Sequence, residues 1–471
     1  MSARLDQAIT VGLLAVIVFT ALAHGAIEPW SVALFELSLV ALLLLWGIKI
    51  VVDKQLVMNI PAAAFPLIAF LALGLAQSIV LTGQDGRRLS LSMNVEITRV
   101  TVTIIFFSLA AFLMAANFLM SRARLRMLTK FIVVFGLAMA VFGLVQKLAW
   151  NGRFYWLRVA SEDIASPFGP FFNHSRFAGY LELLLPVPVA LIMTRSLRLE
   201  ARIFYGFAAV MMGVATIASL SRGGMISLVA ELMFIAILSV RLAREREDVF
   251  QRNILVRRSA GAAHYLRLFS QAGVILTIAL TITLGILWIG PEPVVNRVTQ
   301  GSLASAEPQK ETLWTSRGWI WRDTLTMIRK HPLIGVGLGA FETAYPIYSQ
   351  SDGSLLVNAA HNDYLQVLAE GGVIGGALIL WFIIAIFRAT SRGLRSRDPW
   401  LAGLALGSSA SIFGMLVHSL FDFNLQFPSH ALVFVLLSAV VSHLGAKVPQ
   451  AVAEGAREFE SREKPLVSVI S

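Results

Sequence analysis

The sequence predicts an all-α, polytopic membrane protein with about 12 transmembrane helices, and three observations lead to this fold class. Of the 471 residues, 57% are hydrophobic and only 14% are charged, and the mean hydropathy is +0.73. Apolar runs of roughly 20 residues, the length that crosses a bilayer as a helix, recur from the first turn to Ala446. The Lys and Arg residues gather between these runs. A soluble core does not have this composition, so we expect the chain to insert into a membrane.

The apolar runs give the predicted helices in order along the chain. Gly and Pro near several ends make broken helices an expected feature. Arg4 and the apolar stretch after it also resemble a cleavable signal, but we expect an uncleaved first span. The predicted ranges are residues 8–26, 31–52, 60–82, 100–120, 129–149, 177–195, 202–220, 224–243, 271–290, 365–388, 400–420 and 428–446.

The distribution of basic residues predicts the orientation, because Lys and Arg accumulate in cytoplasmic loops. Alternate loops are rich in these residues, and the loops between them are short or carry few. We therefore expect both termini in the cytoplasm. The predicted outer loops are residues 24–30, 82–99, 150–176, 219–223, 290–364 and 421–428.

Two connections are long enough to fold on their own. The cytoplasmic one, residues 241–269, is rich in Arg and is expected to lie along anionic headgroups. The outer one predicts an amphipathic helix, because Trp314, Arg317, Trp321, Leu325 and Ile328 follow at helical spacing before Pro332. The predicted parts are transmembrane helices one to nine (1–290), the outer loop (291–364), helices ten to twelve (365–446) and a cytoplasmic tail (447–471).

Composition excludes several kinds of chemistry. The net charge of +11 does not predict nucleic-acid binding, because the basic residues are spread over loops rather than gathered on one surface. The absence of Cys excludes disulfides, a thiolate nucleophile and Cys-ligated metals. No HExxH, GxSxG or EF-hand pattern stands out, so neither a metal site nor a serine triad is supported, and no cofactor is predicted.

Two arginines of the predicted outer side are candidate anion ligands. Arg222 lies in the very short turn Ser219-Leu220-Ser221-Arg222-Gly223-Gly224, where the glycines would let a ligand approach the backbone. It is either a fixed cation for a phosphate or an interfacial Arg that reaches lipid phosphate. Arg317 and Arg322 are five positions apart, so they do not share one helical face, and only one is expected to face a cavity. We choose Arg317, because Arg322 has Asp323 beside it.

His361 precedes the predicted span at residues 365–388, where Asn362 or Asp363 can cap the helix. A helix N-terminus favours a bound anion, and an imidazole beside it can accept a proton near neutral pH. The alternative is a hydrogen-bonded interfacial His without chemistry. We interpret His331, His418 and His430 as such bystanders.

A further group of outer residues, 168–182, contains several aromatic side chains and Arg176. It is equally well explained as an aromatic belt with an Arg anchor and as a binding site.

These pieces together resemble the superfamily of O-antigen ligases and Wzy-type polysaccharide polymerases. The similarity covers roughly residues 173–422, and the ordered set is more specific than any single piece. The chain departs from the family pattern at Ser175 and Arg176, where members often have Asn and His, so Arg176 enters only as a weak binding candidate. The matching pieces are Ser221-Arg222-Gly223, Ser316-Arg317-Gly318 with Trp321, Pro332-Leu333-Ile334-Gly335-Val336-Gly337 with Phe341, and His361-Asn362-Asp363-Tyr364-Leu365-Gln366 followed by Glu370-Gly371.

The resemblance implies a GT-C-like helical fold and an inverting, metal-independent transfer of a glycan. The donor would be a glycan on undecaprenyl diphosphate, and the acceptor a hydroxyl on the periplasmic side of a bacterial inner membrane. In this picture Arg222 and Arg317 hold the diphosphate, and His361 positions or deprotonates the acceptor. Asn362 and Tyr364 are further predicted substrate-binding residues. Membrane lipids and a chain-length regulator are expected partners.

The sequence leaves alternatives open. A ligase would use lipid A core or a protein as acceptor, whereas a polymerase would use another repeat unit. A transporter or flippase of lipid-linked anionic glycans also needs outward cations, but transporters usually place polar sites near the bilayer midplane, often in repeated halves. The predicted midplane acids are few, chiefly Glu36 and Glu231, and no repeat is apparent. A structural membrane scaffold would leave the Arg222, Arg317 and His361 set unexplained.

Overall fold

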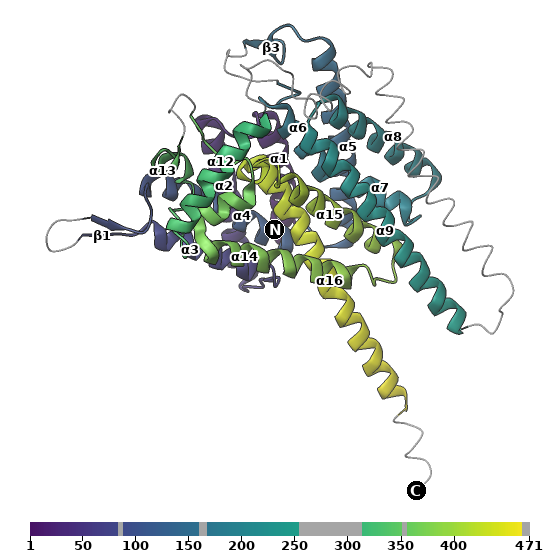
Figure 1. Ribbon diagram of the computed structural model, residues 1–471. Coiled ribbons are helices and arrows are strands. Elements are labelled where there is room, and N and C mark those ends of the chain that lie inside the picture. The colour runs from purple at the N-terminus through teal and green to yellow at the C-terminus, as the bar shows by residue number, and fades with distance from the viewer. Residues whose placement is uncertain (83–87, 160–166, 254–312, 351–355, 464–471) are drawn as a thin grey trace.

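The computed structural model describes residues 1–82, 88–159, 167–253, 313–350 and 356–463, and there the chain is almost entirely helical (Figure 1). Two short antiparallel hairpins pair Leu81 with Leu89 and Phe154 with Arg158. The helices are α1 (Ser2–Leu22), α2 (Pro29–Asp53), α3 (Ala64–Gln77), α4 (Val95–Phe118), α5 (Arg122–Leu148), α6 (His174–Leu184), α7 (Pro186–Met193), α8 (Leu199–Ala218), α9 (Arg222–Asn253), α12 (Leu313–Lys330), α13 (Phe341–Tyr348), α14 (Asp363–Gly393), α15 (Pro399–His418), the 3-10 helix η1 (Asn424–Gln426) and α16 (Pro428–Glu463). The strands are β1 (Val80–Thr82), β2 (Arg88–Ser90), β3 (Arg153–Phe154) and β4 (Arg158–Val159).

Ten helical segments of the described residues are long and apolar enough to cross a membrane. The predicted fold class, an all-α polytopic membrane protein, is therefore confirmed. The predicted span at residues 271–290 and the first part of the predicted outer loop lie outside the described residues.

The predicted span at residues 60–82 is shorter than expected. Helix α3 has 14 residues and a length of about 21 Å, which is less than the hydrocarbon thickness of a bilayer. At its last residue, Gln77, the side chain bonds to distant parts of the chain. The Gln77 amide donates to the carbonyls of Ile334 and Glu370, and its oxygen accepts from the amide of Leu338.

Helix α14 is kinked at Gly372, whose φ of +61° lies in the left-handed region. The amides that lose their helical partners there bond to a loop instead: Val373 donates to Pro332 O at 2.8 Å and Ile374 to Leu333 O at 3.2 Å. A Cβ on Gly372 would overlap the backbone of Leu333. The kink therefore fixes the first turns of α14 against the loop that follows α12.

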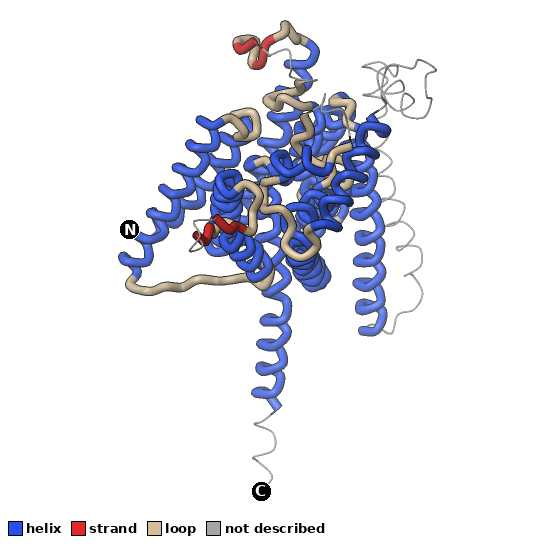
Figure 2. Tube along the Cα trace, turned by 60° about the vertical axis from the view of Figure 1, so that its left-hand side comes forward, coloured by secondary structure: helices blue, strands red, loops and turns tan. Residues whose placement is uncertain are grey.

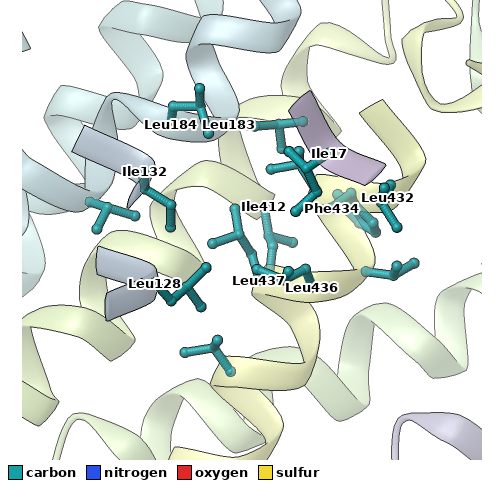
Figure 3. Packing of buried hydrophobic residues seen from close by; sticks show 14 of the residues in the cluster. Ile17, Leu128, Ile132, Leu183, Leu184, Ile412, Leu432, Phe434, Leu436 and Leu437 are labelled. Atoms are coloured by element: carbon teal, nitrogen blue, oxygen red, sulfur yellow. The ribbon is translucent and has the colours of Figure 1, made fainter. Parts of the chain in front are cut away.

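The main hydrophobic core lies where α1, α5, α6, α15 and α16 meet. Figure 3 shows Ile17, Leu128, Leu183, Ile412 and Leu437 converging there, and all five are almost fully buried. This packing sets the relative positions of the ends of α6 and α15, which carry residues of the candidate site.

Contacts between loops agree with the predicted alternation of sides. Among predicted outer segments, Glu28 pairs with Arg158 at 2.6 Å, and among predicted cytoplasmic segments, Arg122 pairs with Asp398 at 2.6 Å. Which set of loops faces the cytoplasm stays a prediction.

Helices α9 and α16 extend beyond the bundle (Figures 1 and 2). Of residues 241–269, which were predicted to lie along anionic headgroups, the first part continues α9 to Asn253, and residues 254–269 lie outside the described residues. The sequence there is rich in Arg and Glu, which are good helix formers, so the helix does not stop where the apolar run stops.

Candidate functional site

His361 lies in the turn that leads into α14, with its backbone in the left-handed region at φ +50°. Asn362 is the N-cap: its Oδ1 accepts from the amides of Tyr364 and Leu365, both at 3.0 Å. Its Nδ2 donates to the carbonyl of Leu420 at 3.1 Å. The predicted cap is confirmed, and its second bond ties the His361 turn to the connection between α15 and α16.

An acid and an aromatic ring from that connection face His361. The Oδ1 atom of Asp422 lies 4.0 Å from His361 Nδ1, and the two side chains are 15% and 33% exposed. The ring of Phe423 meets the imidazole edge to face, with centroids 5.1 Å apart. The imidazole is thus partly shielded from solvent and has a carboxylate on its Nδ1 side.

Arg176 lies in the first turn of α6 and joins the same aromatic group. Its guanidinium lies 3.7 Å from the ring centroid of Phe427 and 5.7 Å from that of Phe423. The backbone carbonyl of Arg176 accepts a hydrogen bond from His430 Nε2 at 2.8 Å. A desolvated cation over aromatic faces is held in place and remains available to an anion on its other side.

Arg317 comes from α12. The amphipathic helix predicted from spacing is confirmed, and Trp321 docks it onto the His361 segment by donating from Nε1 to Ala360 O at 2.9 Å. Arg317 is half-buried, and its charge interacts with Asp422 and His361. Arg322 faces away: it is 52% exposed and donates to Gln350 Oε1 at 2.7 Å.

The charges around His361 determine its protonation state. Burial lowers the pKa of His361 below its usual value, Arg317 and Arg176 lower it further, and Asp422 opposes them. The imidazole is therefore neutral at pH 7 and can accept a proton. Burial also lowers the pKa of Arg317, although an Arg remains a cation at neutral pH.

Arg222 is the first residue of α9. Its neighbour Ser221 donates from Oγ to Ser175 Oγ at 3.2 Å, which places the start of α9 beside the first turn of α6 and Arg176. The predicted cations Arg222 and Arg317 and the weaker candidate Arg176 thus come from three helices to the same end of the bundle as His361.

The remaining predicted substrate-binding residues make bonds within the protein. Tyr364 donates from its hydroxyl to Leu416 O at 2.7 Å, and both ends of the Asn362 amide are used as described above. Tyr364 therefore holds α14 against α15, and Asn362 holds it against the connection that follows α15. Substrate binding by them stays a prediction.

A comparison with known families matches a stretch of the chain that contains part of this site. Residues 207–380 match the family model Wzy_C, described as O-Antigen ligase. This stretch of the chain is thus similar to the O-antigen ligase family, which supports the resemblance seen in the sequence motifs. The matched residues include Arg222, Arg317 and His361, whereas Arg176 and Asp422 lie outside the range. A comparison with curated proteins gave no match.

A cavity of about 660 Å³ adjoins the His361 turn. Its walls come mainly from α3, α4, α14 and α16 and are mostly apolar, with Phe70, Ile105 and Phe382 among the lining residues. Its polar lining includes Asp363, the residue after the N-cap, which accepts a hydrogen bond from Gln426 Nε2 at 3.3 Å. An apolar space inside the bundle therefore lies next to the turn that carries His361.

Several residues around the candidate site were not predicted from the sequence. Asp422 and Phe423 carry no motif, and their position in a predicted outer loop was the only available signal. His418 was interpreted as a bystander, but it forms a buried pair with Glu182, with His418 Nδ1 2.9 Å from Glu182 Oε2. His430 hydrogen-bonds the Arg176 carbonyl, as described above. Within the described residues, no group of three or more His, Cys, Asp or Glu side chains could hold a metal ion.

Proposed function

We propose that this protein transfers a glycan from undecaprenyl diphosphate to an acceptor hydroxyl on the outer side of the membrane, by an inverting reaction that needs no metal. The acceptor is lipid A core in a ligase or a second repeat unit in a polymerase. The observation that carries the proposal is the gathering of Arg176, Arg317, His361 and Asp422 at one end of the helical bundle, next to the start of α9.

The arginine side chains explain how the leaving group is stabilised. When the anomeric C–O bond breaks, the diphosphate gains negative charge, which must be neutralised in the transition state. Guanidinium groups supply fixed, charge-assisted donors in a fork that suits phosphate oxygens. Arg222 and Arg317 are proposed to hold the diphosphate, and Arg176 supports them.

His361 explains how the acceptor hydroxyl is activated as the nucleophile. As the acceptor oxygen bonds to the anomeric carbon, its proton passes to the neutral imidazole, and the diphosphate leaves with the electrons of the broken bond. The Asp422 carboxylate on the Nδ1 side stabilises the imidazolium that forms. Attack from the side opposite the leaving group inverts the anomeric centre.

The apolar cavity suits a lipid-borne substrate. Its walls belong to α3, α4, α14 and α16, and it adjoins the His361 turn. The hydrocarbon chain of the carrier can therefore remain in apolar surroundings while its head group reaches the cations.

The test is a transfer assay with purified protein and lipid-linked repeat units, with and without lipid A core, in which the products are sized. The protein should convert the donor, whereas His361→Ala should give no product. His331→Ala is a matched control, because His331 lies after α12 and bonds to Tyr348 at 2.7 Å, away from the cluster. Full activity of His361→Ala would contradict the proposed chemistry, and movement of the lipid-linked glycan across liposomes without transfer would favour a flippase.

A further inference from the structure

A buried acid–base pair lies beneath the turn that carries Arg222. Glu182 of α6 and His418 of α15 are 0% and 1% exposed, with His418 Nδ1 2.9 Å from Glu182 Oε2 and 3.2 Å from Oε1. Burying ionisable groups inside a membrane bundle costs free energy, so a buried pair does not by itself imply that it stabilises the fold. The role of this pair is therefore inferred from the residues that it contacts.

The pair contacts the two residues that follow Arg222. A Cβ on Gly223 would lie 2.8 Å from His418 Nε2 and 2.9 Å from its Cδ2, and a Cβ on Gly224 would lie 3.1 Å from Glu182 Oε1 and 2.7 Å from Ala178 Cβ. Neither glycine has a left-handed φ. They are small because the imidazole and the carboxylate occupy the space that their side chains would fill.

The turn is also held from its other side. Ser221 donates from Oγ to Ser175 Oγ at 3.2 Å and accepts from the amide of Gly224 at 3.1 Å, so it caps α9 while it is tied to α6. Arg222 is thus the first helical residue between two anchored neighbours, and its backbone has little freedom to shift.

The backbone of His418 also anchors Asp422, the residue that faces His361. The carbonyl of His418 accepts from the amides of Phe421 at 2.8 Å and Asp422 at 3.1 Å. Because α15 packs against both α6 and α9, one buried contact joins the three segments that carry Arg176, Arg222 and Asp422.

We propose that Glu182 and His418 are positioning residues, which set the place of Arg222 relative to Arg176 and Asp422 through the close contact with Gly223 and Gly224. The inference rests on the proposed role of Arg222 in holding the diphosphate. A shift of about 1 Å in a fixed donor is enough to cost a large part of its contribution to binding or rate.

The first test separates position from general packing with two alanine substitutions. Gly223→Ala forces the turn away from His418, whereas a Cβ on Gly206 of α8 would have only Ile192 Cδ1 nearby, at 3.9 Å. The dissociation constant of undecaprenyl diphosphate for the purified protein should rise about tenfold in Gly223→Ala and stay unchanged in Gly206→Ala. An unchanged constant in Gly223→Ala would overturn the inference.

Double variants then show whether the effect passes through Arg222. In an Arg222→Ala background, Gly223→Ala should weaken binding less than about twofold further, whereas its effect should multiply with that of Arg317→Ala. Multiplication in both backgrounds would overturn the inference. If Arg222→Ala alone leaves binding unchanged, the inference and the proposed role of Arg222 both fail; if it weakens binding while Gly223→Ala does not, only the inference fails.

Substitutions of Glu182 distinguish position from charge. Glu182→Gln keeps an oxygen that accepts from His418 Nδ1, so binding should stay within about threefold of the parent protein, whereas Glu182→Ala removes the support and should weaken it about tenfold. Equal losses, with equal thermal unfolding temperatures, would show that the charge of the pair matters rather than its position.

Discussion

Replacing Asp422 with Asn should move the pH dependence of glycan transfer to lower pH. The Asp422 carboxylate lies 4.0 Å from His361 Nδ1 and raises the pKa of that imidazole, against the lowering by burial and by Arg317. Asn has nearly the same shape without the charge. The variant therefore removes the opposing effect and lowers the pKa of His361 further.

The size of the shift follows from the distance. Two unit charges 4 Å apart interact by about 1 kcal/mol in water and about 4 kcal/mol at an effective dielectric constant of 20. His361 is 33% exposed and Asp422 is 15% exposed, so solvent screening favours the lower part of this range, about 1 to 2 kcal/mol. Since one pKa unit corresponds to about 1.4 kcal/mol, we expect a shift of about one unit.

The assay is kcat/KM for a lipid-linked donor between about pH 4.5 and 8, a range that spans the usual titration of His. A general base works unprotonated, so activity falls as the pH drops through its pKa, and a lower pKa moves this acid limb to lower pH. The plateau should fall about fivefold to thirtyfold, because the imidazolium formed in the transition state loses its carboxylate. Glu28→Gln is the control, since Glu28 pairs with Arg158 and does not perturb His361. An unmoved limb, or one that moves to higher pH, would refute the assignment of His361 as the base.

Three further predictions concern the arginine side chains, the independence of the reaction from metal ions, and the stability of the fold. Arg317→Lys should lower kcat/KM about tenfold or more, because the bidentate fork is lost, whereas Arg322→Lys on the same helix should leave it unchanged; equal effects would contradict the proposed geometry. EDTA should not change the transfer rate, since guanidinium groups are proposed to neutralise the leaving group, and inhibition reversed by a divalent cation would contradict this. Gly372→Ala should destabilise the protein by about 1 to 3 kcal/mol or more, seen as a lower thermal unfolding temperature, because the residue has a left-handed φ and no space for a Cβ. An unchanged unfolding temperature would show that the kink can relax.

The length and periodicity of the apolar runs predict most of the fold, because each spanning helix makes its backbone hydrogen bonds within itself. Helix α12 was predicted from the helical spacing of Trp314, Arg317, Trp321, Leu325 and Ile328, although it is not one of the candidate membrane spans among the described residues. Helix α3 was predicted too long, and the side chain of its last residue, Gln77, bonds to a loop more than 250 positions later. Local hydropathy contains no information about such a partner.

The sequence favoured Arg317 over Arg322 because helix geometry lets only one of them face a cavity and Asp323 lies beside Arg322. Five positions on an α-helix correspond to a rotation of about 140° from face to face, so one side chain must turn away when the other faces the cluster. Asp422 could not be chosen in this way. Its approach to His361 depends on how the connection after α15 folds over the start of α14, through bonds such as that from Asn362 Nδ2 to Leu420 O.

The glycines after Arg222 show how a correct choice of residue can rest on an incomplete reason. Two small residues beside a candidate cation were explained by close approach of a ligand to the backbone, which treats the turn as an isolated segment. In the folded chain, Gly223 and Gly224 make room for His418 and Glu182 from two other helices. The small side chains are thus required by buried groups behind the turn, whatever binds in front of it. A substitution at Gly223 is therefore expected to act by moving Arg222, not by blocking a ligand, and the non-additivity of the two changes is the measurable difference.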